Sequence, residues 1–263
     1  VSPDMGEAQL MCLKPSSTGL IYPRFDEEEI NGNTLTLEQA WKSFTGDTRK
    51  HVELSDLIAL FHQKGIQFYV GGDWGFVHNY TLIAAAVLPN GEFWIFETFA
   101  MAGLEFDDQV KYAKYFRDKY KPRKWFMDTA YPQFLKTFRK NKMPCKDFKK
   151  DVMAGIESIR GQVVNASNRR ALKVLKTTEN EYTIKGFRHH HFKLDAQGNI
   201  TTEPDDGEYA DVMDGLRYMG QNLFSVKGTV RAGTDSGINS REAQLRAQNR
   251  ARYGANPDKI HAD

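Results

Sequence analysis

Three aspartates, Asp73, Asp128 and Asp211, stand where segments with the patterns of a strand, a strand and a helix end or begin. Asp73 closes an apolar, β-rich run that starts at Ile66, and glycines on both sides of it would let backbone and metal approach closely. Asp128 closes another short hydrophobic run, which starts at Lys124. The chain contains no competing nucleophile motif, so this layout predicts a metal-dependent nuclease site.

A fourth aspartate follows the third at helical spacing. Asp211 opens a helix pattern, and Asp214 lies three residues further on, so the two carboxylates share one face of that helix. Asp214 has two interpretations, because it could join the acid cluster or pair with Arg217 three residues later. Glu97, at the end of another β-rich run, is expected to be an exposed strand acid rather than a member of the cluster.

Clustered carboxylates suit one kind of hydrolysis in particular. Cleavage of a phosphodiester requires a water molecule that loses its proton near neutral pH. It also requires that the negative charge on the attacking and leaving oxygens is neutralised. Two divalent cations about 4 Å apart supply both effects. Mg²⁺ and Mn²⁺ prefer hard oxygen ligands, and the absence of paired Cys and His residues argues against zinc. Without cations, such carboxylates would repel one another and bind protons more tightly than usual.

Length and composition indicate a folded chain. With 263 residues, 40% hydrophobic and 12% aromatic, the sequence suits one large domain, or one domain with extensions. No run approaches the roughly 18 apolar residues of a membrane span, and the polar N-terminus lacks a signal-peptide core, so we expect no membrane partner and a cytosolic location. Cys12 and Cys145 lie far apart, and reduced thiols are their simplest interpretation.

The net charge of +2 conceals a strong segregation along the chain. Residues 111–193 contain 22 Lys or Arg and 7 Asp or Glu, whereas residues 195–214 contain 7 acidic residues and no basic one. A basic region beside an acidic cluster is typical of a polyanion-binding surface around a cation-binding centre, although lysine-rich helices can also simply be solvated. Cations that hold a DNA backbone do not read bases. The candidates for this role are Lys149, Lys150, Arg160, Arg169 and Arg170.

Hydrophobic periodicity predicts most of the secondary structure. Three β-rich runs, 66–73, 80–88 and 92–99, follow one another, and Asn90-Gly91 between the last two is a strong hairpin signal. The spacing of apolar residues then predicts a helix over 105–120, which Pro122 would end. The later segments are expected to be a strand at 124–128, helices at 133–142 and 152–163, a strand at 171–176, a helix start near Thr178, an auxiliary β-hairpin within 182–200, and a helix at 209–224.

This order is that of a ribonuclease H-like α/β fold. We expect a mixed central sheet in which three antiparallel strands are extended by parallel strands, with helices on both faces and an auxiliary β-hairpin. The triplet His189–His191 is internal, and we expect it on a surface hairpin rather than at a metal site.

With the strand order and the acids in place, the chain resembles the C-terminal nuclease portion of bacteriophage terminase large subunits over about residues 19–224. The matching pieces occur in order along the chain. They are the approach segment 19–26, the first-acid motif Gly72-Asp73-Trp-Gly75, the second-acid strand Phe126-Met-Asp128, the segment 149–160, and the final helix Asp211-Val-Met-Asp214-Gly-Leu-Arg-Tyr218.

The resemblance implies roles for the site residues. Asp73 would bridge two Mg²⁺ or Mn²⁺ ions, Asp128 would hold one of them, and Asp211 would hold the other with Asp214 in or near its ligand shell. One departure concerns this site, because family members often carry another carboxylate or a histidine just before the third acid, where this chain has Tyr209-Ala210.

The resemblance also implies a domain organisation and partners. Residues 1–60 would be an approach segment that follows a missing ATPase domain, residues 61–224 the nuclease domain, and residues 225–263 a polar, basic tail. No Gly-x-x-x-x-Gly-Lys-[Ser/Thr] phosphate loop occurs in the sequence, so the ATPase would lie on an excised part or on another chain. Expected partners are double-stranded DNA, this ATPase, the small terminase subunit and the portal protein, in the host cytoplasm and transiently at the procapsid portal.

The leading hypothesis is therefore an endonuclease that cuts double-stranded concatemeric phage DNA during genome packaging. Two alternatives stay open. One is a junction-resolving or transposase-like nuclease of the same fold, and the other is a DNA-binding or portal-docking module without catalysis.

Overall fold

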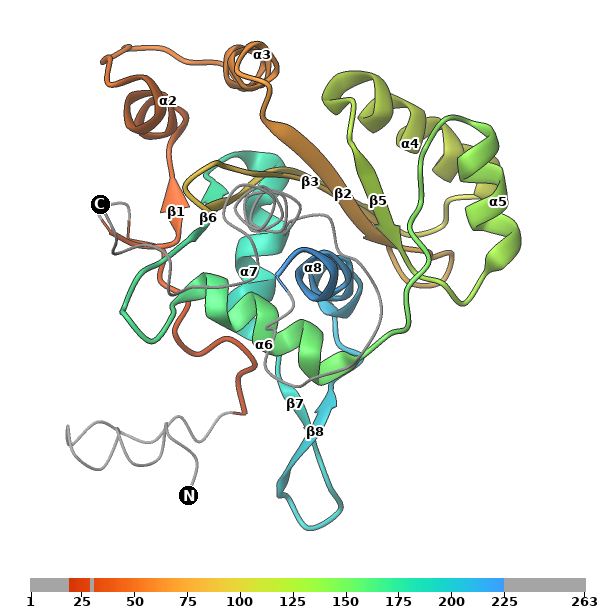
Figure 1. Cartoon of the computed structure of the whole chain (residues 1–263). Coiled ribbons are helices and arrows are strands. Elements are labelled where there is room, and N and C mark those ends of the chain that lie inside the picture. Colours follow the sequence, from red (N-terminus) through yellow and green to blue (C-terminus); the bar gives the residue numbers. More distant parts are fainter. Residues whose placement is uncertain (1–18, 29–30, 225–263) are drawn as a thin grey trace, which may run out of the picture. The chain divides into compact units, whose positions relative to one another are not determined.

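A mixed sheet with the strand order β1-β6-β4-β3-β2-β5 forms the centre of the computed structural model, which describes residues 19–28 and 31–224 (Figure 1). The three central strands are β2 (Gln67–Asp73), β3 (Tyr80–Val87) and β4 (Phe93–Met101). They pair antiparallel in chain order, as predicted. The predicted turn between the last two is also present, because Gly91 has a φ of 83° and donates its N–H to the carbonyl of Leu88 at 2.9 Å.

Parallel strands extend this trio on both sides. β5 (Lys124–Met127) lies parallel to β2, whereas β6 (Leu172–Leu175) lies parallel to β4 at the other side of the trio. The short β1 (Thr34–Leu35) pairs parallel with β6. Beyond β5, Cys145 forms a single parallel bridge with Trp125. The predicted mixed sheet is therefore confirmed.

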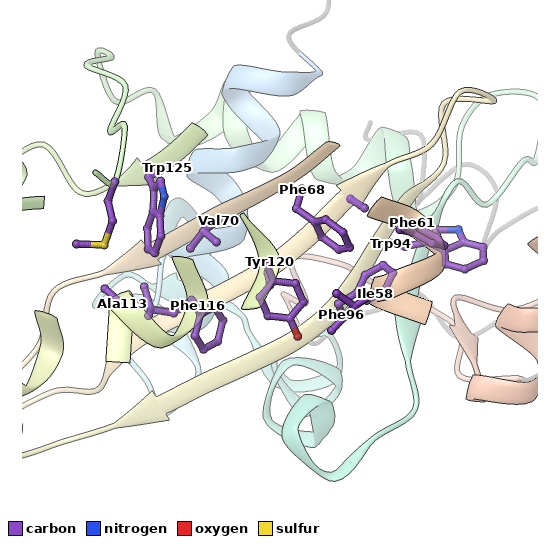
Figure 2. Packing of buried hydrophobic residues seen from close by; sticks show 14 of the residues in the cluster. Ile58, Phe61, Phe68, Val70, Trp94, Phe96, Ala113, Phe116, Tyr120 and Trp125 are labelled. Atoms are coloured by element: carbon purple, nitrogen blue, oxygen red, sulfur yellow. The ribbon is translucent and has the colours of Figure 1, made fainter. Parts of the chain in front are cut away.

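One face of the sheet is covered by α2 (Leu37–Thr45), α3 (Leu54–Gln63), α4 (Phe106–Tyr120) and α5 (Pro132–Lys140). Their apolar stripes meet inward-pointing residues of the strands in a core rich in aromatic rings (Figure 2). In this core Phe61 lies 4.9 Å from Phe96 and 5.6 Å from Trp94, measured between ring centroids. The helices predicted at 105–120 and 133–142 are confirmed, each with small differences at its ends.

The opposite face carries α6 (Val152–Val163), α7 (Glu181–His189) and α8 (Ala210–Leu223). The periodic pattern predicted α6 with the observed bounds, and α8 within one residue at each end. Leu216 and Met219 of α8 are fully buried against the sheet and α6.

Glycines let α8 lie unusually close to its neighbours. A Cβ on Gly71 of β2 would come within 2.3 Å of the carbonyl oxygen of Gly215, and a Cβ on Gly155 of α6 within 2.1 Å of the Arg217 side chain. A side chain at either position would push the helix away. This close approach holds the first turn of α8 beside the end of β2.

The auxiliary hairpin is present but shorter than predicted. It consists of β7 (Phe192–Leu194) and β8 (Ile200–Pro204), which pair antiparallel. The predicted helix start near Thr178 is confirmed by the 3-10 turn Thr178–Asn180 and α7, whereas the strand expected from residue 182 is wrong. The buried Ile184 and Phe187 of α7 lie three residues apart and pack into the core between the sheet and α6, α7 and α8. Tertiary contact therefore overrides the local pattern.

The surface position expected for the histidine triplet is confirmed for His189, which is exposed, and is wrong for His190. His189 ends α7, and His190 follows it with only 3% of its surface exposed. The Nδ1 atom of His190 lies 3.0 Å from a carboxylate oxygen of Asp205. His191 forms a β-bridge with Leu20, so the triplet joins the approach segment to the core.

Described residues of the predicted approach segment pack into the fold. Ile21 and Tyr22 are buried in the core under α6, α7 and α8, and Leu57 is buried on the opposite face. The boundary at residue 60 stays a prediction. Residues 1–18 and the predicted tail 225–263 lie outside the described residues. Within the described ranges, no helix is long and apolar enough to span a membrane.

Candidate active site

The fold brings the three predicted acids to one edge of the sheet. Asp73 is the last residue of β2, and Asp128 directly follows β5, the parallel neighbour of β2. Because Gly72 and Met127 are partners in the register, these two aspartates are next to each other at the carboxyl ends of adjacent strands. Asp211 belongs to the first turn of α8, which lies on β2.

Thr81 and Asn79 fix the first turn of α8 to the strands. The hydroxyl of Thr81 accepts a hydrogen bond from the backbone N–H of Asp73 at 3.1 Å and donates one to the carbonyl of Asp211 at 3.1 Å. The backbone N–H of Asn79 donates to the carboxylate of Asp211 at 2.9 Å. Neither residue was predicted to belong to the site. A polar Thr81 inside an otherwise apolar strand was the only available signal.

The carboxylate of Asp73 lies in the field of the other three acids. Burial raises its pKa well above the usual range, and the negative charges of Asp214, Asp128 and Asp211 raise it further, in that order. Lys150 opposes this shift. The pKa of Asp211 is raised as well, chiefly by burial and secondarily by Asp214, against the hydrogen bond from Asn79 and the charge of His78. The predicted electrostatic strain of the cluster is therefore a property of this fold.

Two basic side chains neutralise part of this charge. Lys150 Nζ lies 2.5 Å from Asp128 Oδ1, which also accepts the N–H of Ala130 at 2.8 Å. Arg217 Nη2 lies 2.6 Å from Asp214 Oδ1, so the ion pair considered for Asp214 is present. Lys150 was predicted to hold the DNA backbone, and the structure places it inside the acid cluster.

Tyr218 supports both of these cations. Its ring centroid lies 5.6 Å from Lys150 Nζ and 5.2 Å from the guanidinium carbon of Arg217. Burial and the nearby charge of Asp73 raise the pKa of its hydroxyl group. Tyr218 was recognised in the sequence only as part of a motif, because nothing local shows that its ring lies beneath two cations.

The donor set fits hard divalent cations, since it consists of carboxylate oxygens, and Asp73 has no ion-pair partner of its own among the described residues. However, no three His, Cys, Asp or Glu side chains of the described part converge into a ready-made metal-binding group. Lys150 and Arg217 each pair with a carboxylate oxygen that a metal ion would need.

The other predicted basic residues lie in different surroundings. Arg160 donates to the carbonyl of Ile21 at 2.7 Å, and Arg170 donates to that of Arg24 at 2.6 Å. Arg169 donates to the carbonyl of Asn90 at 2.8 Å. These three guanidinium groups bind backbone, and the exposed Lys149 lies next to Lys150 in the loop before α6. Their roles in DNA binding stay predictions.

Glu97 is neither exposed nor part of the acid cluster. It is 8% exposed and accepts hydrogen bonds from Lys119 and, at 2.5 Å, from the Tyr120 hydroxyl, both on α4. In the pairing of β3 with β4, Ala84 pairs with Glu97 but Ala85 pairs with Ile95, so one extra residue is inserted in β4. This bulge turns Glu97 toward α4, on the face opposite α8, and the expectation of an exposed acid is wrong.

Comparison with known proteins gives structural matches only. No protein-family model matches the chain, and no curated protein matches it in sequence. The structure is similar to that of a large terminase from a thermophilic bacteriophage, solved in several crystal forms. In one crystal form the match covers 78% of this chain and 46% of the phage chain, at 16% identity and a TM-score of 0.56. In another it covers 85% and 52%, at 16% identity and a TM-score of 0.55.

This chain therefore spans about half the length of these large terminase structures. At this identity the likeness concerns the fold alone. It confirms the ribonuclease H-like class and the predicted resemblance to large terminases at the level of the fold.

Proposed function

We propose that this chain is a metal-dependent endonuclease that cuts double-stranded concatemeric phage DNA during genome packaging. One observation carries the proposal: residues 73, 128 and 211, from three distant parts of the sequence, meet at one edge of the sheet, where burial and then the charges of Asp214, Asp128 and Asp211 raise the pKa of Asp73. Side chains with strongly shifted pKa values and close charged neighbours are concentrated at functional sites.

The chemistry we assign is phosphodiester hydrolysis. Mg²⁺ or Mn²⁺ bound here would lower the pKa of a water molecule and neutralise charge on the phosphate oxygens. Asp73, Asp128 and Asp211 would hold two such ions, and Asp214 adds negative charge beside Asp73. Thr81 and Asn79 keep Asp211 in place through their hydrogen bonds, and Arg217 orients the carboxylate of Asp214.

Lys150 has a position suited to two tasks. Its ammonium group is paired with Asp128 and rests over the ring of Tyr218. When divalent cations bind the carboxylates, Lys150 can leave Asp128 and bind a DNA phosphate instead. The observed ion pair and the predicted DNA contact would then belong to two states of the same side chain. Lys149, Arg160, Arg169 and Arg170 remain our candidates for further backbone contacts.

The likeness to the large terminase of a thermophilic phage supports the wider setting of the proposal. In that setting, the chain acts beside an ATPase domain or chain, a small terminase subunit and a portal protein, in the host cytoplasm and transiently at the procapsid portal. Residues 1–60 would connect to the ATPase, residues 61–224 would form the nuclease, and residues 225–263 would follow it.

One observation favours a second candidate, a DNA-binding or portal-docking module without catalysis. Lys150 and Arg217 neutralise two of the four acids, and no ready-made metal-binding group exists among the described residues. A junction-resolving or transposase-like nuclease would share the acid site. Its substrate preference would separate it from the first candidate.

Cleavage of supercoiled plasmid with Mn²⁺ tests the proposal. We expect the protein to nick and then linearise the plasmid, and Asp73→Ala to abolish both steps. Asp118→Ala on the exposed face of α4 is the matched control and should cut like the wild type. Plasmid that is retained in a binding assay but never cut indicates the non-catalytic module. If Asp73→Ala cuts as fast as the wild type, the site assignment is wrong. Branched junctions cut in preference to linear duplex would indicate a resolvase-like enzyme.

A further inference from the structure

A group of exposed apolar side chains borders the acid cluster. Phe76 and Val77 are 55% and 82% exposed in the loop 74–79 between β2 and β3, and Tyr131 is 45% exposed just before α5. The loop begins directly after Asp73, and Tyr131 follows Asp128 by three residues. The two strand ends that supply acids therefore also supply this apolar border. Its side chains remain exposed in the folded chain.

The border surrounds a cleft of about 410 Å³. This volume lies within the roughly 300–1,000 Å³ of typical ligand clefts. Its walls come from the loop 74–78, from the start of α4 and from Tyr131 and Phe134. Gln109 ties the walls together, because its Nε2 donates to the carbonyls of Gly75 at 2.6 Å and Leu104 at 2.9 Å.

Three aromatic rings form a stack that ends at this cleft. Phe106 and Phe134 lie 4.0 Å apart between centroids, with 16° between their planes. Tyr131 continues the stack on Phe134 at 5.3 Å and 18°. The inner rings are partly buried, and the outer ring of Tyr131 is exposed.

A hydrogen bond couples the stack to the acids. The indole Nε1 of Trp74 donates to the carbonyl of Asp128 at 2.9 Å, and its ring packs edge-on against Phe134 at 5.2 Å. A flat ligand on Tyr131 would therefore be held in a fixed relation to the residue that follows β5.

We propose that Tyr131, with Phe76 and Val77 of the same cleft, stacks an unpaired nucleobase of the DNA strand beside the phosphate to be cut. This inference rests on the proposed function, because it names the form of DNA that the acid site receives. A nucleobase is the flat, uncharged partner that would extend a stack of parallel rings, and base–aromatic stacking tolerates any sequence. Bases inside an intact duplex already stack on their neighbours, so the site takes a base from an opened pair, a nick or an end.

The exposed charges nearby agree with this partner. Lys136 and Lys140 are exposed on α5, the helix that begins directly after Tyr131. They can hold the phosphates of the strand whose base is stacked.

Binding of short DNA duplexes in the presence of Ca²⁺, measured by fluorescence anisotropy with the full chain, tests the inference. One duplex carries a bubble of unpaired thymidines, a second carries the same bubble with abasic sites, and a third is fully paired. We expect the thymidine bubble to bind at least about five-fold more tightly than the abasic bubble, the smallest effect of base–aromatic stacking. Tyr131→Ala should remove this difference, whereas Tyr131→Phe should keep it.

Tyr115→Ala is the matched control, because Tyr115 is also an exposed tyrosine, at 51%, but lies on α4 away from this cleft. It should bind all three duplexes like the wild type. A 2-aminopurine in the bubble should lose fluorescence when it stacks on the wild type and not on Tyr131→Ala. Thermal unfolding of each variant confirms that it is folded, as expected because the side chain of Tyr131 forms no capping hydrogen bond.

The outcomes separate this inference from the proposed function. Equal binding of the thymidine and abasic bubbles by the wild type, or unchanged preference in Tyr131→Ala, overturns the inference, even if Mn²⁺-dependent plasmid cleavage is normal. A Tyr131-dependent preference in a protein that cuts no DNA supports the stacking site and overturns the nuclease function.

Discussion

Gly215 of α8 faces Gly71 of β2 so closely that a Cβ on Gly71 would come within 2.3 Å of the Gly215 carbonyl oxygen. This contact allows a helix to lie directly on a strand and places Asp211 beside the end of β2. The geometry of the acid cluster therefore depends on two residues that have no side chains.

Gly71→Ala should destabilise the protein, because the added methyl group must push α8 from the sheet. We expect the free energy of unfolding to fall by about 1–3 kcal/mol, as for other overpacked cores, and plasmid cleavage to fall with it. Urea unfolding measures this. Gly161→Ala on α6 is the control, since a Cβ there meets nothing within 4 Å, and it should stabilise the helix by up to roughly 1 kcal/mol. Equal effects of the two substitutions would contradict the close contact.

Divalent cations should stabilise the folded protein through the acid cluster. A ligand that binds only the folded state adds about 2.7 kcal/mol at roughly 100 times its dissociation constant. We expect Mn²⁺ to raise the melting temperature of the wild type in differential scanning fluorimetry, and Asp73→Asn to remove most of this rise. A rise of unchanged size in Asp73→Asn would place the cation elsewhere.

The raised pKa of Asp73 predicts how stability depends on pH when no divalent cation is present. Because the folded state binds this proton more tightly than the unfolded state, the free energy of unfolding falls as the pH rises from the usual carboxyl pKa of about 4 through the raised value. Asp73→Asn lacks this contribution, so its stability relative to the wild type should increase across that window. Urea unfolding in EDTA at several pH values measures it. If the difference in free energy of unfolding between Asp73→Asn and the wild type is the same at every pH, folding does not shift the pKa of Asp73.

Asp214 and Arg217 should behave as a coupled pair. Arg217 is 6% exposed and its Nη2 lies 2.6 Å from the carboxylate, so removing Asp214 leaves the guanidinium group buried without its partner, whereas removing Arg217 leaves a carboxylate that is 26% exposed. We expect Asp214→Asn to cost about 3–5 kcal/mol, Arg217→Met to cost less, and the double variant to cost less than their sum. Additive costs in chemical unfolding would show that the pair contributes nothing as a unit.

Glu97 should affect stability and not catalysis. Its carboxylate accepts hydrogen bonds from Lys119 and Tyr120 on the face opposite α8. Glu97→Ala should lower the free energy of unfolding by about 1–3 kcal/mol. The cleavage rate per folded molecule should stay unchanged, and exposed Glu203→Ala should change neither quantity. Loss of cleavage by folded Glu97→Ala would give this residue a role in the reaction.

Local patterns in the sequence were enough to predict most elements of the central sheet and three acids at the ends of such elements. Periods of two and of about 3.6 residues in the apolar pattern predicted β2, β3, β4, α4, α6 and α8, because each pattern reflects which face of a segment meets the core. Where a strand pattern ends at an acidic residue, as at Asp73, the sequence pattern is enough to place that carboxylate at the edge of the sheet.

The surroundings of those acids depend on how distant segments pack together. The bulge in β4 turned Glu97 inward, the fold of the loop before α6 brought Lys150 to Asp128, and α7 replaced a predicted strand. These contacts are made between residues that are far apart in the chain. The sequence around one residue does not identify its partner. The periodic pattern of apolar residues indicates which face of a segment is buried. Which residue of another segment it contacts is set only when the segments pack together.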